Sequence, residues 1–134
     1  PHRSSYLQKV LSKHLDSLLS TITRKSSVRL KVIALIEKRL SKDSVDAEKI
    51  ASKLNMSRNT LYRRLQQEDV SFHSLVDEVR KQKAIGYLND GQLALSQIAF
   101  LLGFSELSAF SRAFKRWTGQ SPVRYLEEQK HKNR

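Results

Sequence analysis

One eight-residue pattern occurs twice in this chain, as IASKLNMS at residues 50–57 and IAFLLGFS at residues 98–105. Each copy continues into a stretch in which apolar residues flank an arginine, LYRRL at 61–65 and FSRAF at 110–114. A short helix, a tight turn and a second helix with a basic outer face produce this pattern. We therefore expect an all-α chain that contains two helix-turn-helix units.

The first unit is expected over residues 46–68. Asp46 is suited to cap a helix that ends near Leu54, because its carboxylate can accept a hydrogen bond from a free backbone N–H. Asn55 stands at the turn, where asparagine tolerates the left-handed backbone conformation. Ser57 is expected to cap the second helix of the unit.

The second unit is expected over residues 94–117, with a glycine, Gly103, at the turn position. Ala94 falls where the first copy has its capping residue, and alanine is a poor cap. The start of this unit is therefore expected to shift, with Ser96 as an alternative cap. Ser105 is expected to begin the second helix.

A single long helix is expected between the two units, from residue 72 to about residue 89, where Asn89-Asp90-Gly91 ends it. At about 1.5 Å per residue such a helix spans roughly 25 Å. This length is a little less than one turn of B-DNA, which is about 34 Å. If the second helix of each unit enters one of two successive major grooves, the duplex must therefore bend or the helices must tilt. Within this helix, Arg80 is expected to form an internal ion pair with Asp77.

Three further helices are predicted outside the units. Residues 5–23 carry one apolar stripe, which predicts an amphipathic helix. Residues 119–122 (GQSP) end one helix and start the last one, with serine as N-cap and proline at the first helical position. A helix over residues 28–40 is expected to turn these residues inward: Leu30, Ile33, Ala34, Ile36 and Leu40.

The amino-acid composition limits the classes of function that the chain can have. A formal net charge of +12 favours a polyanionic partner, and no run approaches the roughly 18 apolar residues of a membrane span. Cysteine is absent, so thiol chemistry is excluded, and a cytoplasmic setting is the simplest. No catalytic arrangement or phosphate-cradling glycine loop occurs, so we expect neither an enzyme nor a cofactor. The four histidines lack metal-ligand spacing, and no metal site is expected: His2, His14, His73 and His131.

These motifs, together with the run from Phe110 to Pro122, resemble the DNA-binding domain of the AraC/XylS family of bacterial transcription regulators over about residues 27–127. The resemblance implies two helix-turn-helix subdomains joined by a long helix, each placing its second helix in the major groove of double-stranded promoter DNA. It also implies an activator that contacts RNA polymerase in the bacterial cytoplasm. Residues 27–134 would form the DNA-binding domain. Residues 1–26 would follow a missing effector or dimerisation domain, and that domain or the 5–23 helix would make a homodimer.

The resemblance also assigns candidate contacts. The base-reading positions fall on Asn59, Tyr62 and Arg63 in the first recognition helix and on Ser108, Ala109 and Arg112 in the second. Arginine can donate two parallel hydrogen bonds to guanine, asparagine suits adenine, and alanine offers only apolar contact, for example with a thymine methyl. Phosphate contacts are expected from basic residues and helix starts: Ser57, Arg58, Arg64, Ser105, Ser111, Lys115, Arg116 and Ser121. The aromatic residues of the second unit are expected to form its core: Phe104, Phe110, Phe114 and Trp117.

Two other readings of the basic chain stay open. A non-specific architectural or RNA-binding protein would carry the same charge, although charge neutralisation alone needs no repeated turn geometry. The 5–23 stripe could also lie on a membrane surface, but it has no interfacial aromatic residue beyond Tyr6, which favours packing against protein.

Overall fold

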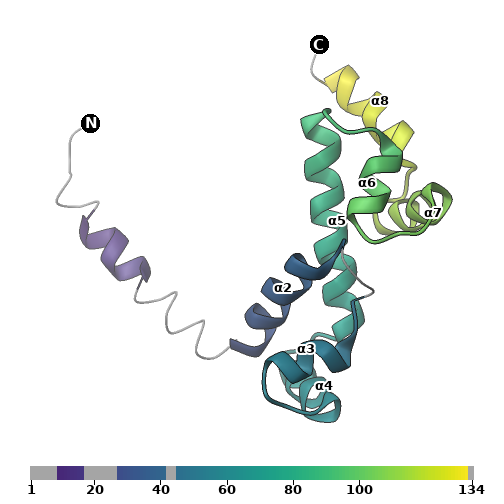
Figure 1. Cartoon of the computed structure of the whole chain (residues 1–134). Helices are drawn as coiled ribbons and strands as arrows, with labels where there is room; N and C mark the ends of the chain where they lie inside the picture. Colours follow the sequence, from purple (N-terminus) through teal and green to yellow (C-terminus); the bar gives the residue numbers. More distant parts are fainter. Residues whose placement is uncertain (1–8, 17–26, 42–44, 133–134) are drawn as a thin grey trace.

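The computed structural model describes residues 9–16, 27–41 and 45–132, and every regular element in these ranges is a helix, as predicted. A short helix covers residues 9–16. Figure 1 shows α5 as the long axis of the molecule, with α3 and α4 at one end and α6, α7 and α8 toward the other. The helices are α2 (Ser27–Arg39), α3 (Ala47–Lys53), α4 (Arg58–Gln67), α5 (Phe72–Asp90), α6 (Leu95–Leu101), α7 (Leu107–Thr118) and α8 (Pro122–Lys132).

The local chemistry of the first unit is the one predicted. The carboxylate of Asp46 accepts a hydrogen bond from the backbone N–H of Glu48 at 2.9 Å and caps α3. Asn55 occupies the turn with a φ of 58°, in the left-handed region. The hydroxyl of Ser57 accepts from the backbone N–H of Thr60 at 3.1 Å and caps α4. A side-chain cap thus fixes the start of each helix of the first unit.

The connecting helix α5 has 19 residues and therefore spans about 28 Å. Ser71 and Ser74 cap its start reciprocally: each hydroxyl accepts a hydrogen bond from the other residue's backbone N–H, at 3.0 and 3.1 Å. Gly91 ends the helix with a φ of 72°, as the predicted turn requires. The rod between the two units is slightly longer than expected.

The second unit starts in a different way from the prediction. Ala94 is the N-cap of α6, so the helix does not shift its start to Ser96. The side-chain oxygen of Gln97 accepts a hydrogen bond from the backbone N–H of Ala94 at 2.8 Å. In a capping box, two residues each accept a hydrogen bond from the other's backbone N–H. Alanine has no side-chain acceptor, so only the bond to Gln97 forms, and it fixes the first turn of α6.

The expected start of α7 at Ser105 is also wrong. Glu106 is the N-cap, and Ser105 lies in the preceding turn. Counting from the cap explains the extra residue of the second copy. Phe110 follows Glu106 by four positions, just as Leu61 follows Ser57 by four. The additional residue therefore belongs to the turn and leaves the two recognition helices in the same register.

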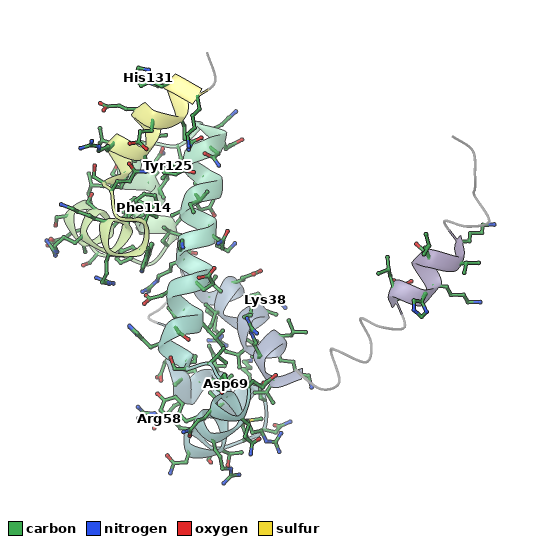
Figure 2. All side chains as sticks on the ribbon, turned by 180° about the vertical axis from the view of Figure 1, so that it is seen from behind. Lys38, Arg58, Asp69, Phe114, Tyr125 and His131 are labelled. Atoms are coloured by element: carbon green, nitrogen blue, oxygen red, sulfur yellow. The ribbon has the colours of Figure 1, made fainter. Side chains whose placement is uncertain are left out.

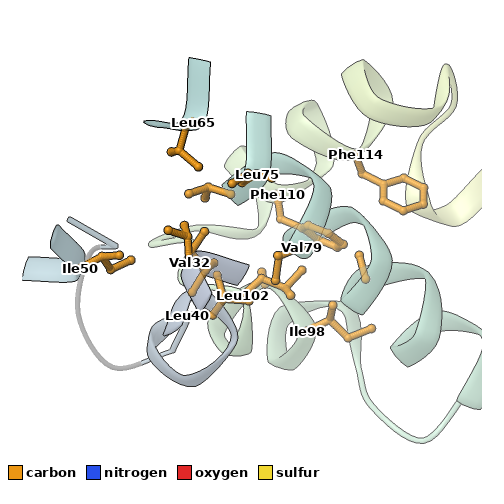
Figure 3. Packing of buried hydrophobic residues seen from close by; sticks show 14 of the residues in the cluster. Val32, Leu40, Ile50, Leu65, Leu75, Val79, Ile98, Leu102, Phe110 and Phe114 are labelled. Atoms are coloured by element: carbon orange, nitrogen blue, oxygen red, sulfur yellow. The ribbon is translucent and has the colours of Figure 1, made fainter. Parts of the chain in front are cut away.

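Apolar side chains from both units form one continuous buried cluster. Figure 3 shows Leu102 of the second unit beside Leu40, at the end of α2, and close to Val79 of α5. All three are at most 6% exposed. The cluster extends to Ile50 in α3 and to Phe114 in α7. The two units are thus parts of a single packed body.

The inward face of α2 differs from the prediction. Val32, Ile36 and Leu40 are buried, whereas Leu30 is 42% exposed and Ala34 is exposed. The buried residues recur every four positions, which is the stripe that a helix turns toward its neighbours. Apolar residues occupy nearly every side of this helix, so periodicity alone did not identify the buried face.

The predicted ion pair between Arg80 and Asp77 within α5 does not form, and each residue contacts a different partner. Asp77 pairs with His73 at 3.4 Å. The Nε–H of Arg80 donates to the carbonyl oxygen of Leu102 at 3.0 Å, so Arg80 makes an internal contact, but not with Asp77.

The described part of the N-terminal stripe is the helix over residues 9–16, and the rest of the predicted 5–23 helix lies outside the described residues. Val10, Leu11 and Leu15 are 49–56% exposed on this helix. Among the described residues, no helix has the length and apolar character that crossing a bilayer requires.

Candidate nucleic-acid interface

The recognition helix of the first unit, α4, has one buried and one open face. Leu61 and Leu65 are fully buried against the core. All three predicted base-reading positions of this helix are exposed, as the helical pattern indicated: Asn59, Tyr62 and Arg63. The buried leucines fix the rotation of α4, and this rotation presents the three polar side chains together.

Two exposed residues of α4 interact with each other. The guanidinium carbon of Arg58 lies 5.1 Å from the centre of the Tyr62 ring, one helical turn away. A hydrogen bond to Tyr62 raises the pKa of Arg58 above its usual value, and arginine is in any case cationic at physiological pH. Tyr62 is 39% exposed, and its ring is held on one side by Arg58. This pair holds a fixed positive charge at the start of α4 (Figure 2).

The recognition helix of the second unit, α7, is anchored in the same way. Phe110 and Phe114 are fully buried. Ser108 and Arg112 are exposed, while Ala109 is half-buried. The outer face of α7 therefore offers fewer hydrogen-bonding groups than that of α4.

An acidic residue that the sequence pattern did not single out stands at the start of α7. The carboxylate of Glu106 accepts a hydrogen bond from the hydroxyl of Ser108 at 3.1 Å. A carboxylate at this end of a helix interacts favourably with the helix dipole, and it can accept from the amino group of cytosine. The shift of the cap from Ser105 to Glu106 brings this group to the edge of the candidate interface.

The candidate phosphate contacts lie at helix starts and on outer faces. The hydroxyls of Ser57 and Ser121 both act as helix caps, and Ser121 accepts from the backbone N–H of Arg124 at 3.2 Å. Ser121 and Lys115 line a polar hollow between α7 and α8, together with Arg124. The other candidates are exposed, except for a half-buried Ser111: Arg58, Arg64, Ser105, Lys115 and Arg116.

Aromatic rings support α7 from behind. Phe104 lies 5.8 Å from Phe110 and 6.1 Å from Trp117, between ring centres. Phe114 lies 5.9 Å from Phe110 and 5.6 Å from Tyr125 of α8, in edge-on arrangements (Figure 2). These rings form the core of the second unit, as predicted, and Tyr125 extends it to α8. They hold α7 rather than offering a stacking surface to nucleobases.

Within residues 9–16, 27–41 and 45–132, no three histidine, aspartate or glutamate side chains are grouped to hold a metal ion. The polar groups that gather on the outer faces of α4 and α7 are hydrogen-bond donors, acceptors and fixed positive charges. Such a set suits the base edges and phosphates of a nucleic acid.

Known proteins share this arrangement. A family model described as a helix-turn-helix domain matches residues 50–128. The HTH-type transcriptional regulator VirS of Mycobacterium tuberculosis is 36% identical over 124 residues, which are 92% of this chain and 36% of VirS. The ornithine utilization regulator of Pseudomonas aeruginosa is 38% identical over 112 residues, which are 84% of this chain and 33% of that protein. The chain thus spans about a third of the length of these curated relatives.

The fold is also found in solved structures. A DNA-binding transcriptional dual regulator from Escherichia coli K-12 superimposes with a TM-score of 0.72 at 26% sequence identity. The superposition covers 78% of this chain and 93% of that one.

Proposed function

The chain belongs to the AraC-type family of helix-turn-helix transcriptional regulators, which are not enzymes, and from this premise we propose how it binds DNA. The protein recognises a specific sequence in double-stranded promoter DNA by inserting α4 and α7 into successive major grooves. One observation carries the proposal: both helices bury a full apolar stripe and turn their polar residues outward. A helix fixed in this way can enter the major groove with its outer face toward the bases.

The proposed base contacts follow from side-chain chemistry. Arg63 and Arg112 each donate a pair of hydrogen bonds to guanine, and Asn59 pairs with adenine. In the second helix, Ser108 can bond either kind of base edge and Ala109 contacts a thymine methyl. Because α7 offers fewer such groups, α4 contributes most of the sequence discrimination and α7 mainly anchors the complex.

Tyr62 completes the proposed base-reading set. Its ring is held against Arg58, so its hydroxyl can reach a base edge or sugar from a fixed position, while Arg58 binds the neighbouring phosphate. The other proposed phosphate contacts surround the two grooves: Ser57, Arg64, Ser105, Ser111, Lys115, Arg116 and Ser121.

Replacing Arg63 with alanine separates base reading from charge. We expect Arg63→Ala to lower affinity for the selected site by about 1–3 kcal/mol and to change affinity for random duplex much less. Lys115→Ala is the matched control. It should weaken binding to both duplexes equally and make the slope of log K against log salt shallower by about 1. The wild-type slope itself should be about −5 to −9, for about 6–10 neutralised phosphates. The site is first selected from a random duplex pool, and fluorescence anisotropy gives the affinities.

Equal losses for Arg63→Ala on both duplexes would remove its base-reading role. Competition by folded RNA as strong as by the selected duplex would favour the architectural or RNA-binding alternative.

At the level of the whole regulator, we propose transcriptional activation through contact with RNA polymerase. Residues 27–134 act as the DNA-binding domain, and residues 1–26 connect it to an effector or dimerisation domain. That domain, or the apolar stripe within residues 5–23, joins two copies of the regulator.

A reporter assay tests the sign of regulation. With the selected site placed next to a weak promoter, expression of the full-length regulator should raise transcription, and Arg63→Ala should reduce the increase. A fall in transcription on the same promoter would identify repression instead, while leaving DNA binding intact.

A further inference from the structure

Arg80 joins the connecting helix to the turn of the second unit. It is half-buried near the middle of α5, and its Nε–H donates to the carbonyl oxygen of Leu102 at 3.0 Å. Its guanidinium carbon lies 4.9 Å from the centre of the Phe104 ring. Leu102 and Phe104 flank Gly103, so one side chain of α5 binds both sides of this turn.

The chemistry of this contact favours a fixed geometry. Leu102 is the C-cap of α6, where backbone carbonyls lack partners within the helix, and a cationic donor makes the stronger kind of hydrogen bond to such a group. Burial lowers the pKa of Arg80, and the nearby Asp77 carboxylate opposes this effect. Arginine nevertheless keeps its charge at neutral pH. The planar guanidinium can therefore bond the carbonyl in its plane and stack on the Phe104 ring at the same time.

A second contact holds the same turn from the side of α2. A Cβ atom added to Gly103 would collide with the carbonyl oxygen of Leu40, so the backbones of the two segments touch there. At its other end, α2 is tied to the first unit, because the backbone N–H of Arg29 donates to the carboxylate of Glu68 at 3.2 Å. Together α2 and α5 form a frame that spans both units.

We propose that Arg80 is a positioning residue that fixes the orientation of the second recognition helix relative to the first, and thereby the spacing between DNA half-sites that the protein accepts. The proposal rests on the two-groove binding proposed above. Arg80 acts through the turn of the second unit and touches no base.

Rotations at this joint change the spacing between the two units. Arg80 lies eight residues from the start of α5, so a tilt of about 20° acting over roughly 12 Å displaces the first unit by about 4 Å. That shift exceeds the rise of one base pair, about 3.4 Å. A joint that holds its angle within a few degrees therefore selects one half-site spacing, whereas a looser joint also accepts spacings that differ by one base pair.

The test measures affinity for duplexes in which one or two base pairs are inserted or removed between the two selected half-sites. The affinity of the wild-type protein should fall about tenfold or more when the spacing changes by a single base pair, as expected when a bidentate base contact is displaced. Arg80→Met keeps the length and apolar contact of the side chain but removes the charged donor. The affinity of this variant should fall only about threefold or less for the same change in spacing. Lys83→Met, on the same helix, removes an equal charge and should keep the wild-type profile.

Binding to a duplex that carries only the half-site of α4 provides the readout that a general loss of structure would change. Arg80→Met should match the wild type on this duplex, with thermal unfolding used to verify folding. Should Arg80→Met not fold, Arg80→Lys, which keeps the charge but loses the planar donor, replaces it in the same measurement. A spacing profile as steep in the Arg80 variant as in the wild type overturns the positioning role and leaves the proposed function intact. A wild-type protein without any spacing preference overturns both.

Discussion

Replacing Phe114 with alanine should lower the free energy of unfolding by about 3–5 kcal/mol, the range for a fully buried phenylalanine. Phe114 is 0% exposed and packs edge-on against Phe110 and Tyr125. Its removal leaves a cavity between α7, α8 and the core, and the surrounding rings cannot fill it. Urea unfolding followed by circular dichroism gives the change as a lower midpoint at an unchanged slope.

Phe100 offers a matched control in the same unit, because its side chain is 68% exposed on α6. We expect Phe100→Ala to change the free energy of unfolding by no more than about 0.5 kcal/mol. If both phenylalanine variants lost the same stability, the packing that holds α7 against the core would have to be rejected.

Replacing Gly103 with asparagine should cost about 1–3 kcal/mol, the usual penalty of overpacking. Gly103 has a φ of 88°, a left-handed value that strains asparagine less than other side chains, so this substitution mainly tests the space at the turn. The added Cβ would collide with the carbonyl oxygen of Leu40 and would lie 3.4 Å from the guanidinium of Arg80. Gly103→Ala should cost about 1–2 kcal/mol more, because alanine adds left-handed strain. Both values come from chemical unfolding.

The converse exchange at the first turn is the control. Asn55 has a similar backbone conformation, with a φ of 58°, but its side chain is exposed. Asn55→Gly should change stability by no more than about 1 kcal/mol, mainly through the greater freedom of the unfolded chain. A Gly103→Asn protein as stable as the wild type would show that the second turn has room for a side chain.

The sequence was sufficient for features that depend on neighbours a few residues away. The caps at Asp46 and Ser57 and the left-handed turns at Asn55 and Gly103 were all predicted, because each depends on local hydrogen bonds and backbone sterics. The open face of α4 was predicted for the same reason, since Leu61 and Leu65 orient the helix.

Features that depend on distant neighbours were not predicted. Arg80 was assigned to Asp77, three positions away, whereas its partner Leu102 lies 22 positions away and reaches it only in the folded chain. Leu30 was expected inside because α2 is apolar on several sides, and only its packing against α3, α4 and α5 decides which side is buried. Local periodicity does not contain this information.

At the candidate site, the faces were predicted better than their details. A single extra residue in the second turn moved the cap from Ser105 to Glu106, and it brought a carboxylate to an interface for which the pattern indicated no acidic residue. The contact between Arg58 and Tyr62 follows ordinary helical spacing, but a one-turn separation does not tell which of several exposed neighbours a flexible arginine will choose.

The unbroken cluster that runs from Ile50 to Phe114 has a consequence for how such proteins diversify. Side chains on the outer surfaces of α4 and α7 can be exchanged without disturbing what lies beneath them. Transplanting an entire half from a relative would instead expose or overfill the shared interior at Leu40, Val79 and Leu102. New target preferences in this architecture are therefore most readily acquired one surface residue at a time.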